Sequence, residues 1–151
     1  ILDADSLNSF QKKTKKFLKY LDKNKLITPH RAEFHRLFPS IKISLSNKEK
    51  VLKFLKVCKS NILLKGNTTV IGSPAKIVIN KHTSSELAVI GSGDVLAGII
   101  ASLVGDKKMS LKEAASAATW IHGDIAKHHG RGLISEDLIK GIPRALQRLK
   151  K

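Results

Sequence analysis

A glycine turn followed by an apolar helix is the stretch of this chain best suited to chemistry. Residues 87–104 read Leu-Ala-Val-Ile-Gly-Ser-Gly-Asp-Val-Leu-Ala-Gly-Ile-Ile-Ala-Ser-Leu-Val. Gly91 and Gly93 are expected to take dihedrals closed to other residues, and the Ser92 hydroxyl is expected to accept from free helix amides. Unpaired amides and the positive end of the helix dipole favour a phosphate there. The turn is therefore predicted to bind an anion.

Asp94 places a carboxylate in the positive field at the start of the same predicted helix. A carboxylate beside a bound phosphate can take the proton of an attacking hydroxyl, so the combination suggests phosphoryl transfer with Asp94 as the base. The turn alone equally allows Asp94 to do no more than cap a buried helix, because short glycine motifs also occur by chance. Both interpretations stay open at this point.

The elements that position this turn begin with an extended segment at residues 1–4. It is predicted to run directly into one helix, marked by Leu7, Phe10, Phe17, Leu18 and Leu21. A short strand is expected at residues 26–28 and closes at Pro29, before a brief helix that ends near Pro39.

The middle of the chain predicts one helix and three strands. Ser46 and Glu49 resemble a capping box for the helix that follows them. Residues 61–65 form an apolar run typical of a buried strand, and a turn-rich connection joins residues 69–71 to residues 77–79 as a hairpin.

Two helices are expected after the glycine turn and its helix. Ser110 and Glu113 form a second capping box, for an alanine-rich helix through about His128. Ser135 begins the last helix, which Pro143 is expected to bend or restart and whose inward residues are predicted to be Leu138, Ile139, Ile142, Leu146 and Leu149. Strands that alternate with helices imply an α/β layered sheet, with binding loops at the carboxyl ends of the strands.

Bulk properties suit a single domain over residues 1–151. No apolar run is long enough to span a bilayer and the first residues lack a basic secretory start, so a cytoplasmic protein without a membrane partner is expected. Cys58 lies among apolar residues and is predicted to be a buried thiol. The net charge is +16, with 23 Lys and 5 Arg. Lysines spread over helical faces favour a solvated surface over a nucleic-acid interface.

Four collinear segments carry a more specific signal: residues 3–8 (Asp-Ala-Asp-Ser-Leu-Asn), 28–34 (Thr-Pro-His-Arg-Ala-Glu-Phe), 64–70 (Leu-Lys-Gly-Asn-Thr-Thr-Val) and 80–98. In this order they resemble the ADP- or ATP-dependent NAD(P)H-hydrate dehydratase family, a branch of the ribokinase-like superfamily. The family's segments read Asp-Ala-Asp-Ala-Leu-Asn, Thr-Pro-His-Pro-Gly-Glu-Phe and Leu-Lys-Gly-Ala-Gly-Thr-Val, and the fourth ends in Gly-Gly-Ser-Gly-Asp-Val-Leu-Thr-Gly. The resemblance implies a ribokinase-like layered sheet flanked by helices.

The resemblance also implies an activity, the repair of hydrated NADH or NADPH. ADP or ATP phosphorylates the new ring hydroxyl, and the phosphate is then expelled to restore the double bond, which makes the enzyme a hydro-lyase. Mg²⁺ is implied as well, with no side chain expected to ligate it directly. Phosphorylation turns a poor leaving group into a good one, so the protein must align the hydroxyl, accept its proton and stabilise the developing charge.

Site residues follow position by position from the same resemblance. Asp94 would contact the hydrate and act as the base, with the amides of Gly91, Ser92 and Gly93 around the transferred phosphate. His30 would contact the hydrated dinucleotide. The nucleotide would be lined by Lys65, Gly66, Asn67, Thr68 and Thr69.

Asn8 and Glu33 match supporting positions, and Glu33 would act through magnesium-bound water. The residues by themselves leave other roles open. His30 suits a turn or core, and Lys65 suits a solvated strand end. Asn8 and Glu33 suit helix caps, and Glu33 also suits a surface carboxylate. The dipeptide at residues 122–123 (His-Gly) also matches the family, and packing is its expected role.

Departures from the family pattern define two further expectations. The family carries further strands and a glycine loop before the Asp-Ala-Asp segment, so a truncated fold is expected, lacking its N-terminal portion and leaving a sheet edge for another chain to cover. Several family glycines or prolines are also replaced, at Arg31, Ala32, Thr68, residues 83–86 and Ile90. Any such position that needs positive φ would be strained by about 1–3 kcal/mol, and Ile90 and Glu86 are expected to interfere most.

Other functions remain as alternatives. One is a ribokinase-like kinase that acts on a sugar or a hydroxymethyl-pyrimidine, and another is an inactive remnant or a basic nucleic-acid-binding module. A separately encoded N-terminal half and a second copy of the chain are the protein partners to test, together with hydrated NADH or NADPH as the small-molecule partner.

Overall fold

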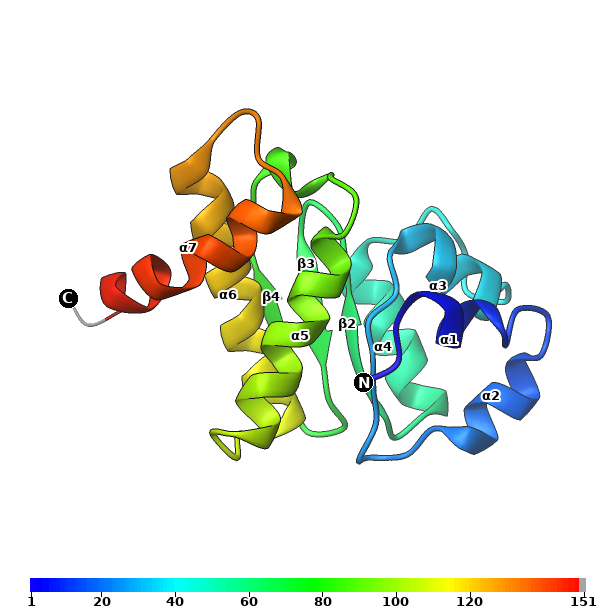
Figure 1. Cartoon of the computed structure of the whole chain (residues 1–151). Helices are drawn as coiled ribbons and strands as arrows, with labels where there is room; N and C mark the ends of the chain where they lie inside the picture. Colours follow the sequence, from blue (N-terminus) through cyan, green and yellow to red (C-terminus); the bar gives the residue numbers. More distant parts are fainter. Residues whose placement is uncertain (150–151) are drawn as a thin grey trace. The chain divides into compact units, whose positions relative to one another are not determined.

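The computed structural model describes residues 1–149 and divides the chain into two compact units (Figure 1). The first unit spans Ile1–Ile79 and the second begins at Asn80. In the described part of the chain, no helix combines the length and the apolarity that a membrane crossing requires.

A mixed four-stranded sheet organises the first unit. Its strands are β1 (Leu26–Ile27), β2 (Asn61–Leu64), β3 (Thr69–Gly72) and β4 (Ile77–Asn80), in the order β1-β2-β3-β4. β1 pairs parallel with β2, and β2 pairs antiparallel with β3. The four strands lie where the sequence predicts them. The extended segment at residues 1–4 is reduced to one parallel bridge, between Leu2 and Ile27.

Four helices accompany this sheet, namely α1 (Ala4–Asn8), α2 (Thr14–Tyr20), α3 (Arg31–Leu37) and α4 (Asn47–Val57). The prediction of one continuous helix across the first two is wrong. Between them the chain turns at Lys12, whose φ of 61° lies outside the helical region. The apolar residues of the predicted helix are still used, because Leu7 and Phe17 are both fully buried.

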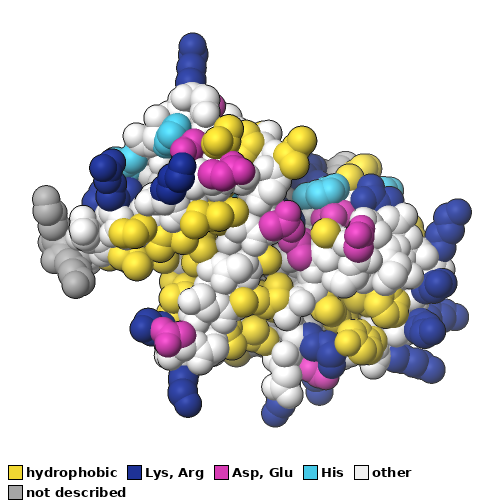
Figure 2. Space-filling model, viewed as in Figure 1, with side chains coloured by type: hydrophobic (Ala, Val, Ile, Leu, Met, Phe, Trp, Pro, Cys, Tyr) yellow, Lys and Arg dark blue, Asp and Glu magenta, His cyan; other side chains and the backbone are white. Residues whose placement is uncertain are grey.

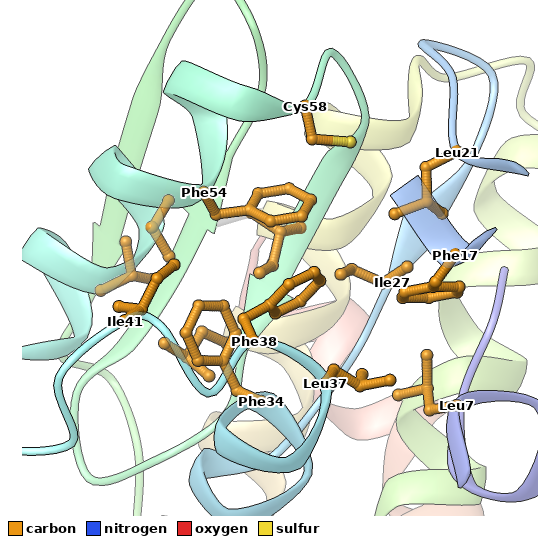
Figure 3. Close-up of a cluster of buried hydrophobic side chains, with 14 residues drawn as sticks. Leu7, Phe17, Leu21, Ile27, Phe34, Leu37, Phe38, Ile41, Phe54 and Cys58 are labelled. Atoms are coloured by element: carbon orange, nitrogen blue, oxygen red, sulfur yellow. The ribbon is translucent and has the colours of Figure 1, made fainter. Parts of the chain in front are cut away.

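Aromatic side chains fill the core of the first unit (Figure 3). Phe38 lies 5.0 Å from Phe34 and 5.1 Å from Phe54, measured between ring centroids. Cys58 lies at the edge of this cluster and is buried, as predicted. Burial raises the pKa of the Cys58 thiol, which keeps it protonated and unreactive.

The second unit is helical. A short 3₁₀ helix η1 (Ser85–Leu87) precedes α5 (Ser92–Gly105), α6 (Leu111–His129) and α7 (Ser135–Arg148). Both capping boxes predicted from the sequence are present, one at Ser46 in the first unit and one at Ser110 here. α6 and α7 approach closely, since a Cβ on Gly141 would lie 2.4 Å from Ile125 Cγ2.

α7 departs from its prediction in the face that it buries. Pro143 lies inside the helix, so the chain does not restart there and the bend stays a prediction. Leu138 and Ala145 are buried, but the side chains of Ile139, Leu146 and Leu149 are exposed instead of facing inward. Figure 2 shows hydrophobic side chains along the length of α7. The apolar stripe is wider than the contact that neighbouring helices offer, so only one edge of it is covered.

Candidate functional site

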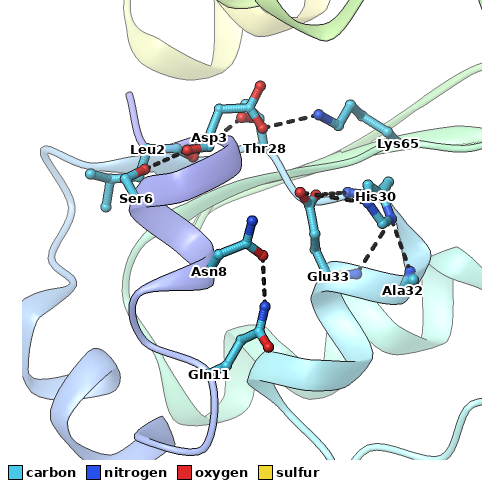
Figure 4. Close-up of polar contacts among 10 residues, drawn as sticks. All are labelled: Leu2, Asp3, Ser6, Asn8, Gln11, Thr28, His30, Ala32, Glu33 and Lys65. Atoms are coloured by element: carbon cyan, nitrogen blue, oxygen red, sulfur yellow. Dashed lines mark hydrogen bonds and ion pairs between the residues drawn. The ribbon is translucent and has the colours of Figure 1, made fainter. Parts of the chain in front are cut away.

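Polar residues of the first unit gather at the carboxyl ends of parallel strands (Figure 4). Asp3 follows the bridging residue Leu2, His30 follows β1, and Lys65 follows β2. The Lys65 amide donates to the Pro29 carbonyl at 2.9 Å, and His30 and Lys65 form a parallel bridge. Carboxyl ends of strands are the usual ligand-binding edge of an α/β sheet. The fold therefore brings the predicted residues His30 and Lys65 together.

Lys65 is held by a carboxylate that the site prediction did not include. Its Nζ lies 3.0 Å from Asp3 Oδ1. This contact replaces the alternative of a lysine free in solvent. The pair keeps the ammonium group at the strand edge, where a phosphate would have to share it with Asp3. Asp3 belongs to the Asp-Ala-Asp segment, so the motif contained the signal for this role.

His30 is the N-cap residue of α3. Its Nδ1 accepts from the amides of Ala32 at 3.1 Å and Glu33 at 3.3 Å. An imidazole nitrogen that accepts carries no proton, so the ring proton of neutral His30 lies on Nε2. The side chain is 50% exposed. The cap thus orients a half-exposed histidine with Nε2–H as its donor.

Glu33 completes the capping box and is buried. Its Oε2 accepts from the His30 amide at 2.8 Å, and its Oε1 lies 3.5 Å from His30 Nε2. Of the roles that the sequence left open for Glu33, namely a helix cap, a surface carboxylate and action through magnesium-bound water, these contacts show the cap. Asn8 lies on α1 and its Oδ1 accepts from Gln11 Nε2 at 2.7 Å. The polar contact of Asn8 is therefore made within its own segment.

The predicted nucleotide loop is the tight connection between β2 and β3. Gly66, Asn67 and Thr68 are exposed at its tip, whereas Thr69 is buried and its hydroxyl donates to the Gly66 carbonyl at 3.1 Å. Asn47, a residue that nothing in the sequence singled out, donates from Nδ2 to the Thr68 carbonyl at 2.9 Å. A Cβ at position 66 would lie 2.8 Å from Asn47 Nδ2, so a larger residue there would displace the Asn47 side chain.

The second unit contains the glycine turn. Gly91 is the N-cap residue of α5 and takes a φ of 80°, as expected for a glycine in that place. A Cβ at this position would also lie 3.2 Å from Ser135 Oγ. Gly93 differs from its prediction, because it lies within the first turn of α5 and has no positive φ. Only the first of the two glycines supplies an unusual backbone conformation.

Ser92 does not cap the helix as the sequence suggested. It is the first residue of α5 and is buried, and no side chain caps this helix. Its hydroxyl instead lies 3.3 Å from His122 Nε2 on α6. The same nitrogen lies 3.0 Å from the Ser92 carbonyl oxygen. His122, expected only to pack, is therefore in polar contact with the turn.

Asp94 lies in the first turn of α5 and is exposed to solvent. The Ser92 amide donates to the Val89 carbonyl at 3.3 Å, whereas the other amides of a first helical turn have no intrahelical acceptor, so a carboxylate and backbone donors share this end of the helix. Ile90 is 98% exposed and its side chain projects into solvent. Strain was expected at any replaced family position that needs a positive φ, and none of them takes one, since the positive-φ residues other than glycine in the described chain are Ala4, Lys12 and Lys108.

The segment that leads into the turn is docked on α6. The His82 ring stacks on Trp120 with centroids 5.0 Å apart, and its Nδ1 lies 3.1 Å from Lys127 Nζ. A Cβ on Gly123 would lie 1.8 Å from the His82 carbonyl oxygen. His82 Nε2 also lies 3.5 Å from the buried carboxylate of Asp124. This close approach explains glycine at position 123 and holds the backbone of the preceding segment against the helix.

A cavity of about 290 Å³ lies between α6 and α7, lined by Ile125, His128, His129, Asp137, Gly141, Arg144 and Arg148. Arg148 pairs with Asp124, and His129 lies 3.6 Å from Asp137. This cavity contains none of the predicted site residues. Within residues 1–149, no cluster of three or more His, Cys, Asp or Glu side chains is arranged to hold a metal ion.

Comparisons with known proteins identify the family to which the sequence is similar. The family of NAD(P)H-hydrate dehydratases matches residues 1–144. An ADP-dependent (S)-NAD(P)H-hydrate dehydratase of Neisseria meningitidis is 37% identical over 131 residues, which are 83% of this chain and 44% of that protein. A bifunctional NAD(P)H-hydrate repair enzyme of Moorella thermoacetica is 34% identical over 99% of this chain and 29% of its own length. The chain thus spans less than half of these curated relatives.

Solved structures agree on the fold. The ADP/ATP-dependent NAD(P)H-hydrate dehydratase of Bacillus subtilis, co-crystallised with ATP/Mg²⁺, matches with a TM-score of 0.72 and 28% identity, over 82% of this chain and 48% of that one. A ribokinase-like superfamily protein of Enterococcus faecalis matches with a TM-score of 0.81 and 22% identity, over 97% and 51%. The chain therefore belongs to the NAD(P)H-hydrate dehydratase family, within the ribokinase-like fold.

Proposed function

We propose that this chain carries the phosphoryl-transfer residues of a nucleotide-dependent NAD(P)H-hydrate dehydratase. The observation that carries the proposal is the start of α5, where the exposed carboxylate of Asp94 stands in the first helical turn directly after Gly91. Free amides and a helix dipole favour a phosphoryl group there, and the carboxylate can accept a proton beside it. Family membership supplies the substrate class.

In the proposed reaction, the ring hydroxyl of the hydrate attacks the terminal phosphorus of the nucleotide. The hydroxyl proton passes to Asp94, a new O–P bond forms, and the bond to the leaving phosphate oxygen breaks. The ring nitrogen then donates its electron pair as the C–O bond breaks, so inorganic phosphate leaves and an iminium forms. The neighbouring ring carbon next loses a proton to water, and the electrons of that C–H bond form the ring double bond while the pair returns to nitrogen. The amides of Gly91, Ser92 and Gly93 would stabilise the charge on the transferred group.

Residues of the first unit are proposed to bind the ligands. His30 offers Nε2–H as a donor for the hydrated dinucleotide. Lys65 and the loop through Thr69 would contact the nucleotide, with Lys65 as a point charge for phosphate oxygens. Glu33 already accepts from the His30 amide, so any action through magnesium-bound water would use its second oxygen. Asn8 is proposed only as support.

ADP or ATP with Mg²⁺ is the proposed donor. The Bacillus subtilis relative was crystallised with ATP/Mg²⁺, and the Neisseria relative is named as ADP-dependent. Mg²⁺ characteristically binds through substrate phosphates and water with few protein ligands, which suits a site for which no direct protein ligand is proposed. The ion would neutralise phosphate charge when it is bound. The chain's own contribution is the set of amides, Lys65 and Asp94.

Complete turnover is proposed to need parts of the fold that this chain does not contain. The curated relatives are more than twice as long as their matched segments, which supports this view. A neighbouring segment or a separately encoded chain would then supply further dinucleotide contacts. Turnover should accordingly be measured for this chain alone and for this chain mixed with any partner encoded next to it.

Asp94→Asn tests the proposed role of the carboxylate. Turnover of NADH hydrate, followed by the return of NADH absorbance, is expected to fall at least a hundredfold, because general-base catalysis is worth that much. ADP affinity, measured by titration calorimetry, is expected to change by less than about threefold, since the amides remain. Asp106→Asn is the matched control, because Asp106 is an exposed aspartate at the other end of the same helix.

Equal turnover in Asp94→Asn and the parent chain would contradict the role of Asp94. Absence of both nucleotide binding and turnover, alone and with any partner, would contradict the enzyme proposal. Steeply salt-dependent binding to DNA or RNA that Asp94→Asn leaves unchanged would favour the basic-module alternative. Phosphorylation of a sugar or a hydroxymethyl-pyrimidine without hydrate repair would favour the kinase alternative.

A further inference from the structure

His122 lies inside α6 with 5% of its surface exposed, and one ring nitrogen contacts the turn before Asp94. Nε2 lies 3.0 Å from the Ser92 carbonyl oxygen and 3.3 Å from Ser92 Oγ. A carbonyl oxygen only accepts hydrogen bonds, so His122 Nε2 must carry a proton. The Ser92 carbonyl oxygen therefore shows which nitrogen of the buried His122 ring carries the proton, namely Nε2.

This tautomer also decides the role of the Ser92 hydroxyl. Because Nε2–H is a donor, Ser92 Oγ can only accept from it, and the hydroxyl proton is left for another acceptor. Ser92 lies between Gly91 and Gly93, whose amides are the proposed phosphate donors. His122 thus holds the Ser92 carbonyl by a hydrogen bond. It also leaves the Ser92 hydroxyl free to act as a donor in addition to the backbone amides.

The surrounding contacts show that α6 is a platform for this whole segment. The backbone of His82 lies against Gly123, and its ring stacks on Trp120. At the far side of the turn, a Cβ on Gly91 would lie 3.2 Å from the Ser135 side chain at the start of α7, which is closer than an ordinary van der Waals contact. The backbone before and after the turn is therefore fixed by close packing. His122 supplies a directional polar contact between these two fixed points.

We propose that His122 is a positioning residue that holds the Gly91–Asp94 turn in its anion-binding conformation by donating from Nε2 to Ser92. This inference rests on the proposed function of the turn, but the contact itself can be tested without turnover. A residue that only fills space at this position needs the right volume. A positioning residue needs an N–H at the right place, and a glutamine side chain offers one whereas leucine offers none.

The test compares His122→Leu with His122→Gln, and uses His128→Gln as the matched control on the exposed side of the same helix. Hydrogen exchange of the amides at residues 92–95 is measured by NMR in the full chain. His122→Leu is expected to speed this exchange about tenfold, whereas His122→Gln and His128→Gln stay within about threefold of the parent, because one directed hydrogen bond is lost only in the first. ADP affinity should follow the same order, with roughly tenfold loss in His122→Leu.

The parent chain gives a second readout that needs no variant. Imidazole ¹⁵N shifts of His122 are expected to show a protonated Nε2, and a protonated Nδ1 with bare Nε2 would overturn the proposal. Unchanged exchange at residues 92–95 in His122→Leu would also overturn it, as would equal acceleration in His122→Gln. Failure of the parent chain to bind ADP would instead count against the proposed function, because exchange and tautomer do not depend on ligand.

Discussion

At the scale of single residues, Gly91 is where backbone conformation and proposed chemistry coincide. Its φ of 80° is open to glycine and costly for other residues. The neighbouring Ser135 side chain adds a steric limit, since a Cβ would lie 3.2 Å from its Oγ. Asp94 follows three residues later with its carboxylate in solvent. The turn thus requires glycine for its geometry and carries the aspartate that is proposed to accept the proton.

Gly91→Ala is expected to destabilise the chain by about 1–3 kcal/mol, because a left-handed non-glycine residue is strained. Gly98→Ala is the matched control within α5. A Cβ there meets no atom within 4 Å, so this change is expected to stabilise the chain by about 0.5–1 kcal/mol. Urea unfolding curves give both free energies. Similar values for the two variants would contradict the strain argument.

At the scale of elements, a capping box fixes where α6 begins. The Ser110 hydroxyl accepts from the Glu113 amide at 3.4 Å, and Glu113 Oε2 accepts from the Ser110 amide at 3.1 Å. α6 carries His122 and the docking surface for the segment that precedes the turn. The start of α6 therefore sets the register of residues that contact the turn.

The capping box predicts a pH dependence of stability. Hydrogen bonds from the Ser110 hydroxyl and amide lower the pKa of Glu113 below its ordinary value. A lowered carboxyl pKa contributes stability above the unfolded-state pKa, and this stability is lost as the pH falls through the folded-state pKa. Ser110→Ala should therefore destabilise the chain by about 1 kcal/mol near neutral pH and progressively less in acid.

Ser116→Ala is the control for this prediction, because the Ser116 hydroxyl donates to the Lys112 carbonyl on the same helix at 2.8 Å and has no carboxylate partner. Thermal melting of both variants and the parent across the acidic range gives the comparison. A Ser110→Ala penalty that stays constant through acid would show that Glu113 does not take part in the cap.

At the scale of the whole molecule, the net charge of +16 acts on every phosphorylated ligand. Such a field raises the affinity for any nucleotide and is screened by salt, so it cannot by itself define a site. Unlike the lysines that are spread over helical faces, Lys65 lies at the end of β2 and is held there by an ion pair with Asp3. Specific binding should therefore depend on Lys65 more than on any one surface lysine.

Lys65→Gln is expected to weaken ADP binding about tenfold at low ionic strength, as is typical when a charged hydrogen-bond donor is removed. Lys15→Gln, at an exposed position on α2, should change it by less than twofold. Binding to the parent chain should weaken as salt is raised, whereas binding of uncharged adenosine should not. Equal losses of ADP affinity in the two variants would show that binding depends on the net positive charge of the whole chain and not on Lys65.

Much of the fold could be predicted from local patterns. The buried run at Ile62 and the two serine capping boxes were located correctly because each depends on neighbours in the sequence. The prediction failed where the outcome depended on distant packing. A turn at Lys12 divides the first predicted helix, and Ile139 is exposed although the apolar spacing of α7 predicted that it faces inward.

The candidate site shows the same division. The sequence alone determined the family and the position of the glycine turn, and it singled out Asp94 as the candidate base. These are properties of short collinear segments. Tertiary structure decided that Asp3 holds Lys65 and that His122 donates to Ser92. These partners lie far apart along the chain, and whether two polar groups meet depends on how strands and helices pack, which no local pattern encodes.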